Sequence, residues 1–236
     1  MKVLVFDIFG KYAHYKKIYA TTSAITYSIP TKTSLFGYLW AIGALKKNSD
    51  KNFYLQYFQS KSCLLGIQIL NPIVHQRINT NLLSNITRKW EHKPTMMEYV
   101  SNPKFRIYVA LSDQSFFDNL KNNLSEGKSV YTPTFGTANL ISMFSWVGEF
   151  ETQIEKRDYT VKIVSVIPKK KFIDFDVDFY NKYDFDIIEQ SMFPIEMDSE
   201  RNVTERDDIL MERNAGIIKA KVTDFCVING QNIILF

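Results

Sequence analysis

The sequence predicts an α+β fold built on a ferredoxin-like (RRM-like) β-α-β-β-α-β domain, with a long β-hairpin arm and a strand-rich C-terminal extension. Three observations support this class. Segments of strand and helix type alternate over residues 1–148 in the order of a split βαβ unit. The two middle strands are joined by a connection far longer than a hairpin requires. Beyond residue 148 the apolar segments are short and β-branched. We therefore expect one domain over residues 1–148, with its arm at about 76–102, and a β-rich extension over 149–236 packed on it.

The chain begins with a strand, a loop and a helix. KVLVFDIF at 2–9 holds Val3, Val5 and apolar neighbours and ends before Gly10, which predicts a buried strand. Residues 10–34 show no period of 2 or 3.6, so we expect mostly loop. Thr31 or Thr33 can cap a helix over about 33–47. NFYLQYFQS can form a short second helix after it.

The next two strands flank the arm. SCLLGIQILNPIVHQRI at 62–78 predicts a long strand interrupted at its Asn-Pro pair, because proline cannot donate to a sheet ladder. KFRIYVAL at 104–111 alternates as a strand does. Residues 79–101 between them are polar and irregular. Their Trp90 and two adjacent methionines indicate an arm that docks on another molecule.

A second helix, a turn and further strands complete the chain. Asp113 can cap a helix up to about residue 124, with Gly127 just beyond its end. YTPTFGTA predicts a turn and ANLISMFSWVG a strand. EFETQIEKRDYTVKIVSVIP can give two strands or one bent strand, and Asn229-Gly230 predicts a tight hairpin near the C-terminus.

Two acidic segments lie within the extension. DFDVDFYNKYDFDIIEQ at 174–190 alternates, which favours a half-exposed strand, and its carboxylates could also form a surface for a protein partner. DSERNVTERDDILMERN at 198–214 is so highly charged that we expect a surface loop or a short helix.

Charge is divided unevenly along the chain. The 236 residues have a formal net charge of +4. Residues 1–110 hold 15 basic and 4 acidic side chains (+11), whereas residues 111–236 hold 14 and 21 (−7). A polyanion would prefer the first half, because Lys and Arg that neutralise phosphates release counterions. The alternative is that both halves carry solvated charge and the division is accidental.

Several classes of protein are excluded by what the sequence lacks. Two Cys and three His are too few for a zinc ribbon or finger array. No Walker loop, dinucleotide fingerprint, HExxH or GxSxG motif occurs. No stretch approaches the roughly 18 apolar residues of a membrane span. We expect a cytoplasmic protein without membrane, metal or cofactor.

One cluster of residues could either cleave RNA or bind it: Tyr12, His14, Tyr15, Lys16 and Lys17. Metal-free RNA cleavage needs a general base, a general acid and a cation for the charged transition state, and these residues supply all three. The same residues suit simple RNA binding, because aromatic rings stack on bases and lysines contact phosphates. Binding requires no exact geometry, so we favour it.

FGKYAHYKKIYATTSAITYSIPTKTSLFGYLWAIGAL at 9–45 resembles the N-terminal signature of the CRISPR-associated Cas family five, of the type I-B kind, in the RAMP superfamily. YTPTFG at 131–136 resembles the Thr-Pro-x-aromatic-Gly turn of the same family. Two positions depart from its pattern. Lys16 stands where the family often has Arg, which keeps the charge but loses the bidentate fork. Thr31 stands where a second proline is common.

The resemblance implies a non-catalytic subunit of Cascade, the RNA-guided surveillance complex of antiviral defence. Such a subunit caps the 5′ handle of the CRISPR RNA (crRNA). Its arm, called the thumb, presses on the guide and contacts the backbone subunit (Cas family seven), and the subunit also docks the large subunit (Cas family eight). Target DNA would be met only indirectly, through the complex. Type I-C relatives cleave precursor crRNA, so a metal-independent endoribonuclease is the first alternative and a protein-only scaffold the second.

The RNA-binding residues implied by the resemblance and by the charge of the first half fall in three groups. They lie in the basic loop and helix start, in the arm, and in the Thr-Pro turn. They are Tyr12, His14, Tyr15, Lys16, Lys17, Thr22, Ser23, Lys32 and Thr33; Gln76, Arg77, Arg88, Lys89, Trp90 and Lys93; and Thr134 and Gly136.

Overall fold

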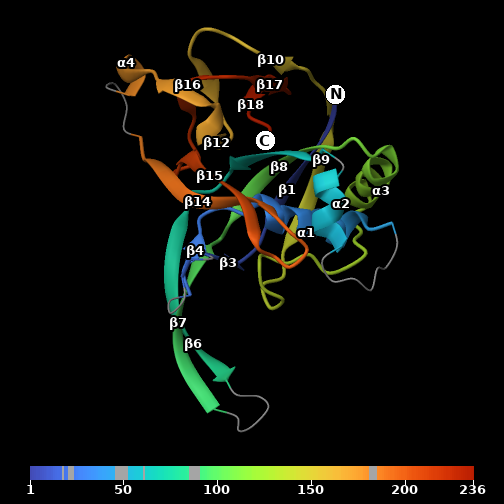
Figure 1. Cartoon of the computed structure of the whole chain (residues 1–236), viewed down its shortest axis with the longest axis vertical. Coiled ribbons are helices and arrows are strands. Elements are labelled where there is room, and N and C mark those ends of the chain that lie inside the picture. The colour runs from blue at the N-terminus through green and yellow to red at the C-terminus, as the bar shows by residue number, and fades with distance from the viewer. Residues whose placement is uncertain (18, 21–23, 46–52, 61, 85–90, 181–184) are drawn as a thin grey trace.

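A four-stranded sheet lies at the centre of the molecule (Figure 1). The computed structural model describes residues 1–236 except 18, 21–23, 46–52, 61, 85–90 and 181–184. The strand order is β5-β8-β1-β9, and each neighbouring pair is antiparallel. The strands are β1 (Lys2–Phe9), β5 (Leu64–Ile69), β8 (Lys104–Ala110) and β9 (Met143–Glu151). The strands predicted at 2–9 and 104–111 are confirmed, and the one at 62–78 is divided at Asn71-Pro72 as expected.

Helices cover one face of this sheet and C-terminal strands cover the other. The helices are α1 (Lys32–Gly43), α2 (Phe53–Ser60) and α3 (Gln114–Ser125). Because alternate side chains of a strand point to opposite faces, Leu4 and Phe6 of β1 pack in the cluster that contains the helices. Val3 and Val5 pack instead against residues near the C-terminus.

Both main helices begin at a predicted N-cap residue. The Thr31 side chain accepts a hydrogen bond from the Ser34 amide, so of the two candidates Thr31 is the cap of α1. Asp113 caps α3 in the same way, by accepting from the Phe116 amide. α1 ends at Gly43, before the expected residue 47.

The arm is a regular hairpin that projects from the body (Figure 1). β6 (Val74–Ser84) and β7 (Glu91–Ser101) pair over their whole length, and β2 (Tyr12–Ala13) adds a third strand at the base. The long β-hairpin arm expected at about 76–102 is therefore present, although the local pattern within 79–101 predicted irregular structure. Most described side chains of the arm are exposed, so no apolar alternation marks it as a strand.

Short strands complete the loop between β1 and α1 and build the extension. β3 (Tyr15–Lys16) pairs with β4 (Thr26–Tyr27) in the loop. One C-terminal sheet has the order β10 (Ile154–Glu155), β17 (Phe225–Ile228), β18 (Gln231–Ile233), β11 (Val161–Ile163), β16 (Ile218–Val222) and β13 (Phe172–Phe175). The other has the order β12 (Ile167–Pro168), β15 (Val203–Glu212) and β14 (Ile187–Met197). η1 (Lys169–Lys171) and α4 (Val177–Tyr180) are short helical turns.

Two expectations for the extension are corrected. Residues 198–214 contain the long strand β15, where high charge predicted a loop or helix. Its partner β14 satisfies its backbone, and Ile209, Leu210 and Met211 anchor one end in the core. In the described part of 174–190, β13 ends at Phe175, α4 follows and β14 begins at Ile187, so the segment is not one continuous strand. The Asn229-Gly230 hairpin is confirmed, with φ of +49° and +74° at the two residues.

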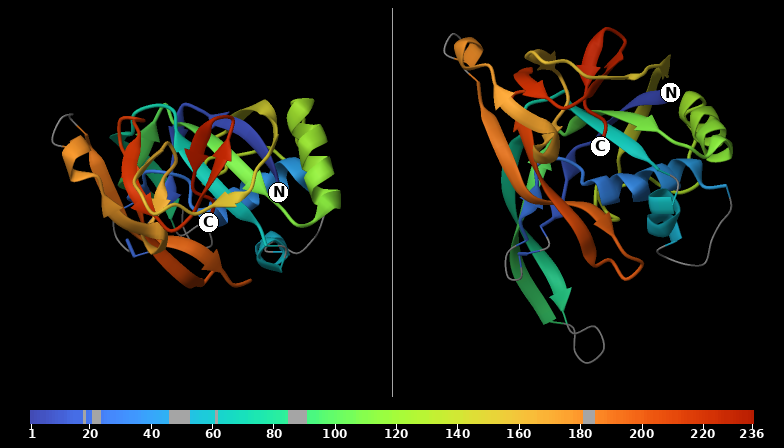
Figure 2. Two further views of the ribbon diagram at one scale, coloured as in Figure 1. Left: turned by 90° about the horizontal axis from the view of Figure 1, so that it is seen from above. Right: turned by 45° about the horizontal axis from the view of Figure 1, so that its top comes forward.

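The β14–β15 hairpin reaches across to the helices (Figure 2). The Gln59 side-chain amide of α2 donates to the Met197 carbonyl of β14 at 2.6 Å. Phe193 and Ile195 of β14 join the cluster that contains α1. The C-terminal half therefore borders the same helices as the basic loop. Within the described residues, no helix has the length and apolar character needed to span a membrane.

Candidate nucleic-acid interface

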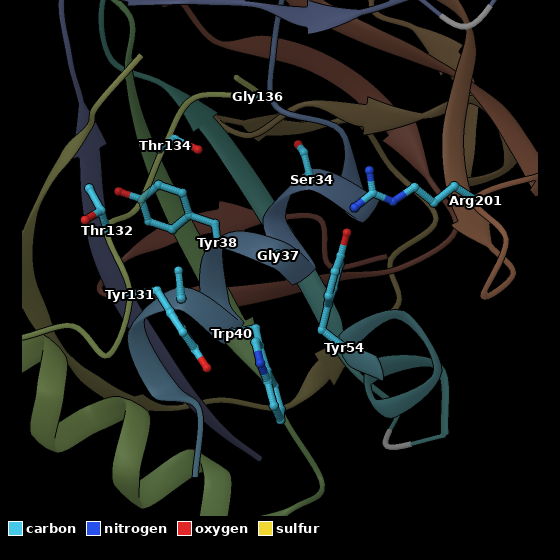
Figure 3. Close-up of a pocket in the computed structure, with 11 residues that line it drawn as sticks. Ser34, Gly37, Tyr38, Trp40, Tyr54, Tyr131, Thr132, Thr134, Gly136 and Arg201 are labelled. Atoms are coloured by element: carbon cyan, nitrogen blue, oxygen red, sulfur yellow. The ribbon is translucent and has the colours of Figure 1, made fainter. Parts of the chain in front are cut away.

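Two adjoining hollows form one groove along α1, which we call the α1 groove. The arm-side hollow, of about 490 Å³, is bordered by the loop at 14–16, the first turn of α1, the arm and the β14–β15 hairpin. The aromatic hollow, of about 480 Å³, is bordered by α1, α2 and the segment 131–136 (Figure 3). Residues that line both hollows form the junction: Ser34, Tyr54, Gly136 and Arg201.

The basic loop is fixed from two sides. Tyr12 and Ala13 pair with the base of the arm through β7. The Nδ1 atom of the His14 ring lies 2.7 Å from the Glu98 carbonyl oxygen, and the His14 amide donates to the Phe135 carbonyl at 3.1 Å. His14 is 3% exposed. The loop is therefore preorganised by the fold, and the His14 imidazole is held in it by a backbone carbonyl.

Gly136 lets the loop and the 131–136 segment approach closely. Its φ is +91°, in the left-handed region that favours glycine. A Cβ built on it would lie 2.0 Å from the carbonyl oxygen of His14, which is far inside van der Waals contact. A glycine is thus required for these two segments to meet at the groove.

Tyr15 contributes a ring but no available hydroxyl. The side chain is 4% exposed and packs edge-on against Phe135. Its hydroxyl is buried and has no hydrogen-bond partner in the described part of the chain. Burial, and secondarily the nearby Tyr38, raise the pKa of Tyr15 well above its usual value. The phenol therefore stays neutral and acts in the site as an apolar ring.

Tyr15→Phe is expected to raise the free energy of unfolding by about 1 kcal/mol, because it removes a buried hydroxyl that is unsatisfied. Tyr38→Phe is the matched control. The Tyr38 hydroxyl accepts from Ser142 at 3.0 Å and donates to the Met143 carbonyl at 3.4 Å, so its loss is expected to cost about 1 kcal/mol. Urea unfolding measures both changes. Equal destabilisation by the two variants would show that the Tyr15 hydroxyl has a partner.

The cations of the loop differ in their exposure. Lys16 is exposed and Lys17 is half-buried, and neither forms an ion pair with a carboxylate in the described residues. The Lys17 ammonium lies 5.8 Å from the centroid of the Tyr27 ring. Both lysines are available to a polyanion.

The structure does not place Lys32 at the groove. The side chain is 8% exposed, and its ammonium lies 5.9 Å from the ring centroids of both Phe36 and Phe236. Burial lowers the pKa of this ammonium. Its position as the first residue of α1 turns it into the core, so a phosphate contact by Lys32 does not fit the structure.

The other candidate residues are divided between the groove and the arm. Thr33 lines the arm-side hollow and Thr134 the aromatic hollow. Tyr12 packs against Tyr99 at the base of the arm. Gln76, Arg77 and Lys93 are exposed on the arm and line neither hollow. Five candidates lie outside the described residues: Thr22, Ser23, Arg88, Lys89 and Trp90.

Sequence reasoning missed three residues of the junction. Ser34 and Tyr54 carry no recognisable signal, since each follows a pattern typical of ordinary helices. Arg201 belongs to the charged segment expected to be a surface loop or short helix. It lies in the turn between β14 and β15, and only the pairing of these strands brings it to α1.

Several carboxylates of the C-terminal half are paired with basic side chains of the same half. The pairs are Lys169–Glu189, Lys170–Glu205, Lys171–Asp224, Lys219–Asp176, Lys221–Asp158 and Arg213–Asp186. The negative charge of this half is thus partly neutralised locally, whereas the lysines at 16 and 17 have no such counterpart among the described residues. The imbalance noted in the sequence leaves positive charge beside the groove.

Comparison with known proteins gives similarity of structure only. No family model matches the sequence, and no curated protein is significantly similar to it. The structure is similar to a CRISPR protein from Archaeoglobus fulgidus, with a TM-score of 0.57 and 9% identity, over 99% of this chain and 98% of that one. The chain shares its fold with that CRISPR protein. At this identity the similarity establishes the fold alone.

Two further structures are similar at lower scores. One is a chain of a CRISPR RNA-guided surveillance complex, with a TM-score of 0.48, 12% identity and coverage of 92% and 91%. The other is a chain of the Type III-B Cmr-beta complex bound to cognate target RNA and AMPPnP, with a TM-score of 0.46, 13% identity and coverage of 93% and 86%.

Proposed function

We propose that the chain is a non-catalytic Cas family five subunit of a type I-B Cascade and holds the 5′ handle of the crRNA in the α1 groove. One observation carries this proposal: two separate sequence motifs converge on the groove. Tyr15, Lys16 and Thr33 come from the motif at 9–45 and Gly136 from the motif at 131–136, and all four line the arm-side hollow. The fold shared with a CRISPR protein supports it.

We assign the central sheet to the ferredoxin-like class. The support is its order, β5-β8-β1-β9, its antiparallel pairing and the helices on one face. RRM domains of this class bind RNA on the open face of the sheet. In this chain Val3, Val5 and Tyr108 of that face pack against C-terminal residues such as Ile233. The RNA would therefore bind beside α1 instead.

The geometry of His14 favours binding over cleavage. A general base must be within reach of the proton that it abstracts, whereas this imidazole is buried and bonded to the Glu98 carbonyl. Purified protein incubated with repeat RNA in EDTA is expected to bind the RNA and leave it uncut. Specific cleavage that disappears in His14→Ala would favour the metal-independent endoribonuclease, and failure to bind any RNA would favour the protein-only scaffold.

The arm is proposed to contact the guide and the Cas family seven backbone subunit, and the C-terminal half the Cas family eight large subunit. Deletion of residues about 80–98 is the direct test of the arm. The structure indicates that a shorter segment must be deleted if the folded body is to stay intact. Glu98 bonds to Thr26 and His14, and Ala24 pairs with Met97, so the base of the arm belongs to the folded body.

Replacement of residues 81–94 by an Asn-Gly turn is expected to leave the free energy of unfolding within about 0.5 kcal/mol of the wild type. The Thr80–Thr95 pair then closes the shortened hairpin. The same variant is expected to lose assembly with the backbone subunit in a co-expression pull-down. Deletion of 80–98 is the comparison, and it should destabilise the body as well. Full assembly by the shortened arm would contradict the proposed contact.

A further inference from the structure

The aromatic hollow is lined by two tyrosine rings that belong to no aromatic cluster of the described residues, although one of them, Tyr54, also packs at the edge of the core. Trp40 is surrounded by Phe53, Tyr57, Phe58 and Phe116 and is therefore part of the core. In the described residues, Tyr54 and Tyr131 form no ring contact, although both line the hollow. Tyr131 is 37% exposed. Figure 3 shows these two rings on either side of α1.

Gly37 of α1 also lines the hollow, and Figure 3 shows it on the helix between the two tyrosines. A Cβ on Gly37 would meet the Tyr54 ring at 3.5 Å, which is an ordinary contact, and its φ lies outside the left-handed region. Packing therefore does not require glycine here, and glycine is an unfavourable residue inside a helix. The consequence of Gly37 is that the Tyr54 ring lies close to the backbone of α1 at the edge of the hollow.

The walls also offer polar groups and a cation. Thr132 and Thr134 line the hollow, and no hydrogen bond engages their hydroxyls within the described residues. Arg201 extends from the β14–β15 turn toward Ser34 and Tyr54 at the junction of the two hollows (Figure 3). Its φ is +66°, a conformation uncommon for a residue with a side chain. The Asp198 carboxylate fixes this turn by accepting from the Asn202 amide at 2.8 Å.

We propose that the aromatic hollow binds one unstacked nucleobase of the guide RNA, and that Arg201 contacts the phosphate that links this nucleotide to the strand in the arm-side hollow. The volume of about 480 Å³ is within the range of small-molecule sites. Rings stack on the face of a base, hydroxyls bond its edge, and an arginine binds phosphate through its fork. The proposal rests on the proposed function, because it requires RNA in the α1 groove.

The test uses the full chain and single-stranded RNA of about ten nucleotides copied from the 5′ handle of the repeat. A series of these RNAs carries one abasic ribose at each position in turn. For the wild type, one position is expected to lose about tenfold or more in affinity, since stacking on aromatic side chains is of that size. The other positions should lose less.

Gly37→Leu is the decisive variant. A Cβ at this position already meets the Tyr54 ring at 3.5 Å, so the rest of a leucine side chain must displace this aromatic wall or occupy the hollow beside it, and leucine is a better helix former than glycine. It should bind the intact RNA about tenfold more weakly than the wild type does, and it should no longer distinguish the abasic position. Gly37→Ala, which adds one methyl group, should show a smaller loss. Two outcomes would overturn the nucleobase site while RNA binding itself stands. One is equal affinity of Gly37→Leu and the wild type for the intact RNA. The other is equal affinity of the wild type for every RNA of the abasic series.

Arg201→Gly tests the cation separately. Glycine adopts positive φ without strain, so the turn is expected to form. A plot of the logarithm of the binding constant against the logarithm of the salt concentration has a negative slope. This slope should become shallower by about 0.7, the value for one phosphate contact with a single strand. An unchanged slope would remove Arg201 from the site. Absence of RNA binding by the wild type would instead refute the proposed function and this inference with it.

Discussion

Gly136→Ala is expected to lower the free energy of unfolding by roughly 3 kcal/mol or more and to abolish RNA binding. Two effects add. The residue has φ of +91°, and its new methyl group would lie 2.0 Å from the His14 carbonyl oxygen. That oxygen is backbone, so it can move only if the basic loop moves with it. Urea unfolding measures the first effect and RNA affinity measures the second.

Gly127→Ala separates backbone strain from the steric clash. Gly127 follows α3 with φ of +67°, and nothing lies within 4 Å of a Cβ built on it. This control should lose only about 1 kcal/mol, the cost of a left-handed conformation for alanine. RNA affinity of the control should equal that of the wild type. Similar losses for both glycines would mean that the contact between His14 and Gly136 is not what holds the groove together.

The elements that the sequence predicts well are those with one dominant physical signal. β1 has apolar side chains on both faces because it lies between the helices and the C-terminal strands, and its mostly apolar sequence shows this. The caps of α1 and α3 are visible because Thr31 and Asp113 precede helical segments. The hairpin at Asn229-Gly230 is visible because both residues tolerate positive φ.

β15 shows why the remainder is harder to predict. Its charged positions pair with neighbours outside the strand, as Lys170 with Glu205 does, so a segment that resembles a solvated loop forms a strand. Tertiary pairing overrides local propensity in such cases. Most described side chains of the arm are exposed, so the signal of alternation is absent there too.

The residues of the candidate site also fall into two groups: those that the local sequence predicts, and those that only tertiary packing brings together. Tyr15 and Lys16 are adjacent in the chain, so the sequence alone shows that they form a cluster. Tyr54 and Arg201 reach the groove only through the packing of α2 and the β14–β15 hairpin on α1. The acidic character of the C-terminal half predicts a surface that faces proteins. The position of Arg201 indicates that this half also supplies part of the proposed RNA site, while several of its carboxylates are paired with lysines of the same half.

The double variant Lys16→Ala, Lys17→Ala is expected to weaken handle RNA binding about tenfold or more at low salt. Lys16 is exposed at the arm-side hollow, and Lys17 follows it in the same loop. The negative slope of log K against log salt should become shallower by about 0.7 for each phosphate contact that is lost. The fold should be kept, since neither ammonium is ion-paired in the described residues. Affinity titrations over a range of salt concentrations measure both quantities.

A control with the same change of net charge decides whether the effect is local. Lys169→Ala, Lys170→Ala also removes two positive charges, but these lysines pair with Glu189 and Glu205 on the extension. If RNA binds at the basic loop, the control should keep nearly the wild-type affinity, because screening limits charge effects to about 10 Å at moderate salt. Equal weakening by both double variants would indicate attraction to total charge. If RNA affinity changed neither with salt concentration nor with the double substitution of Lys16 and Lys17, the RNA-binding role would lose its support.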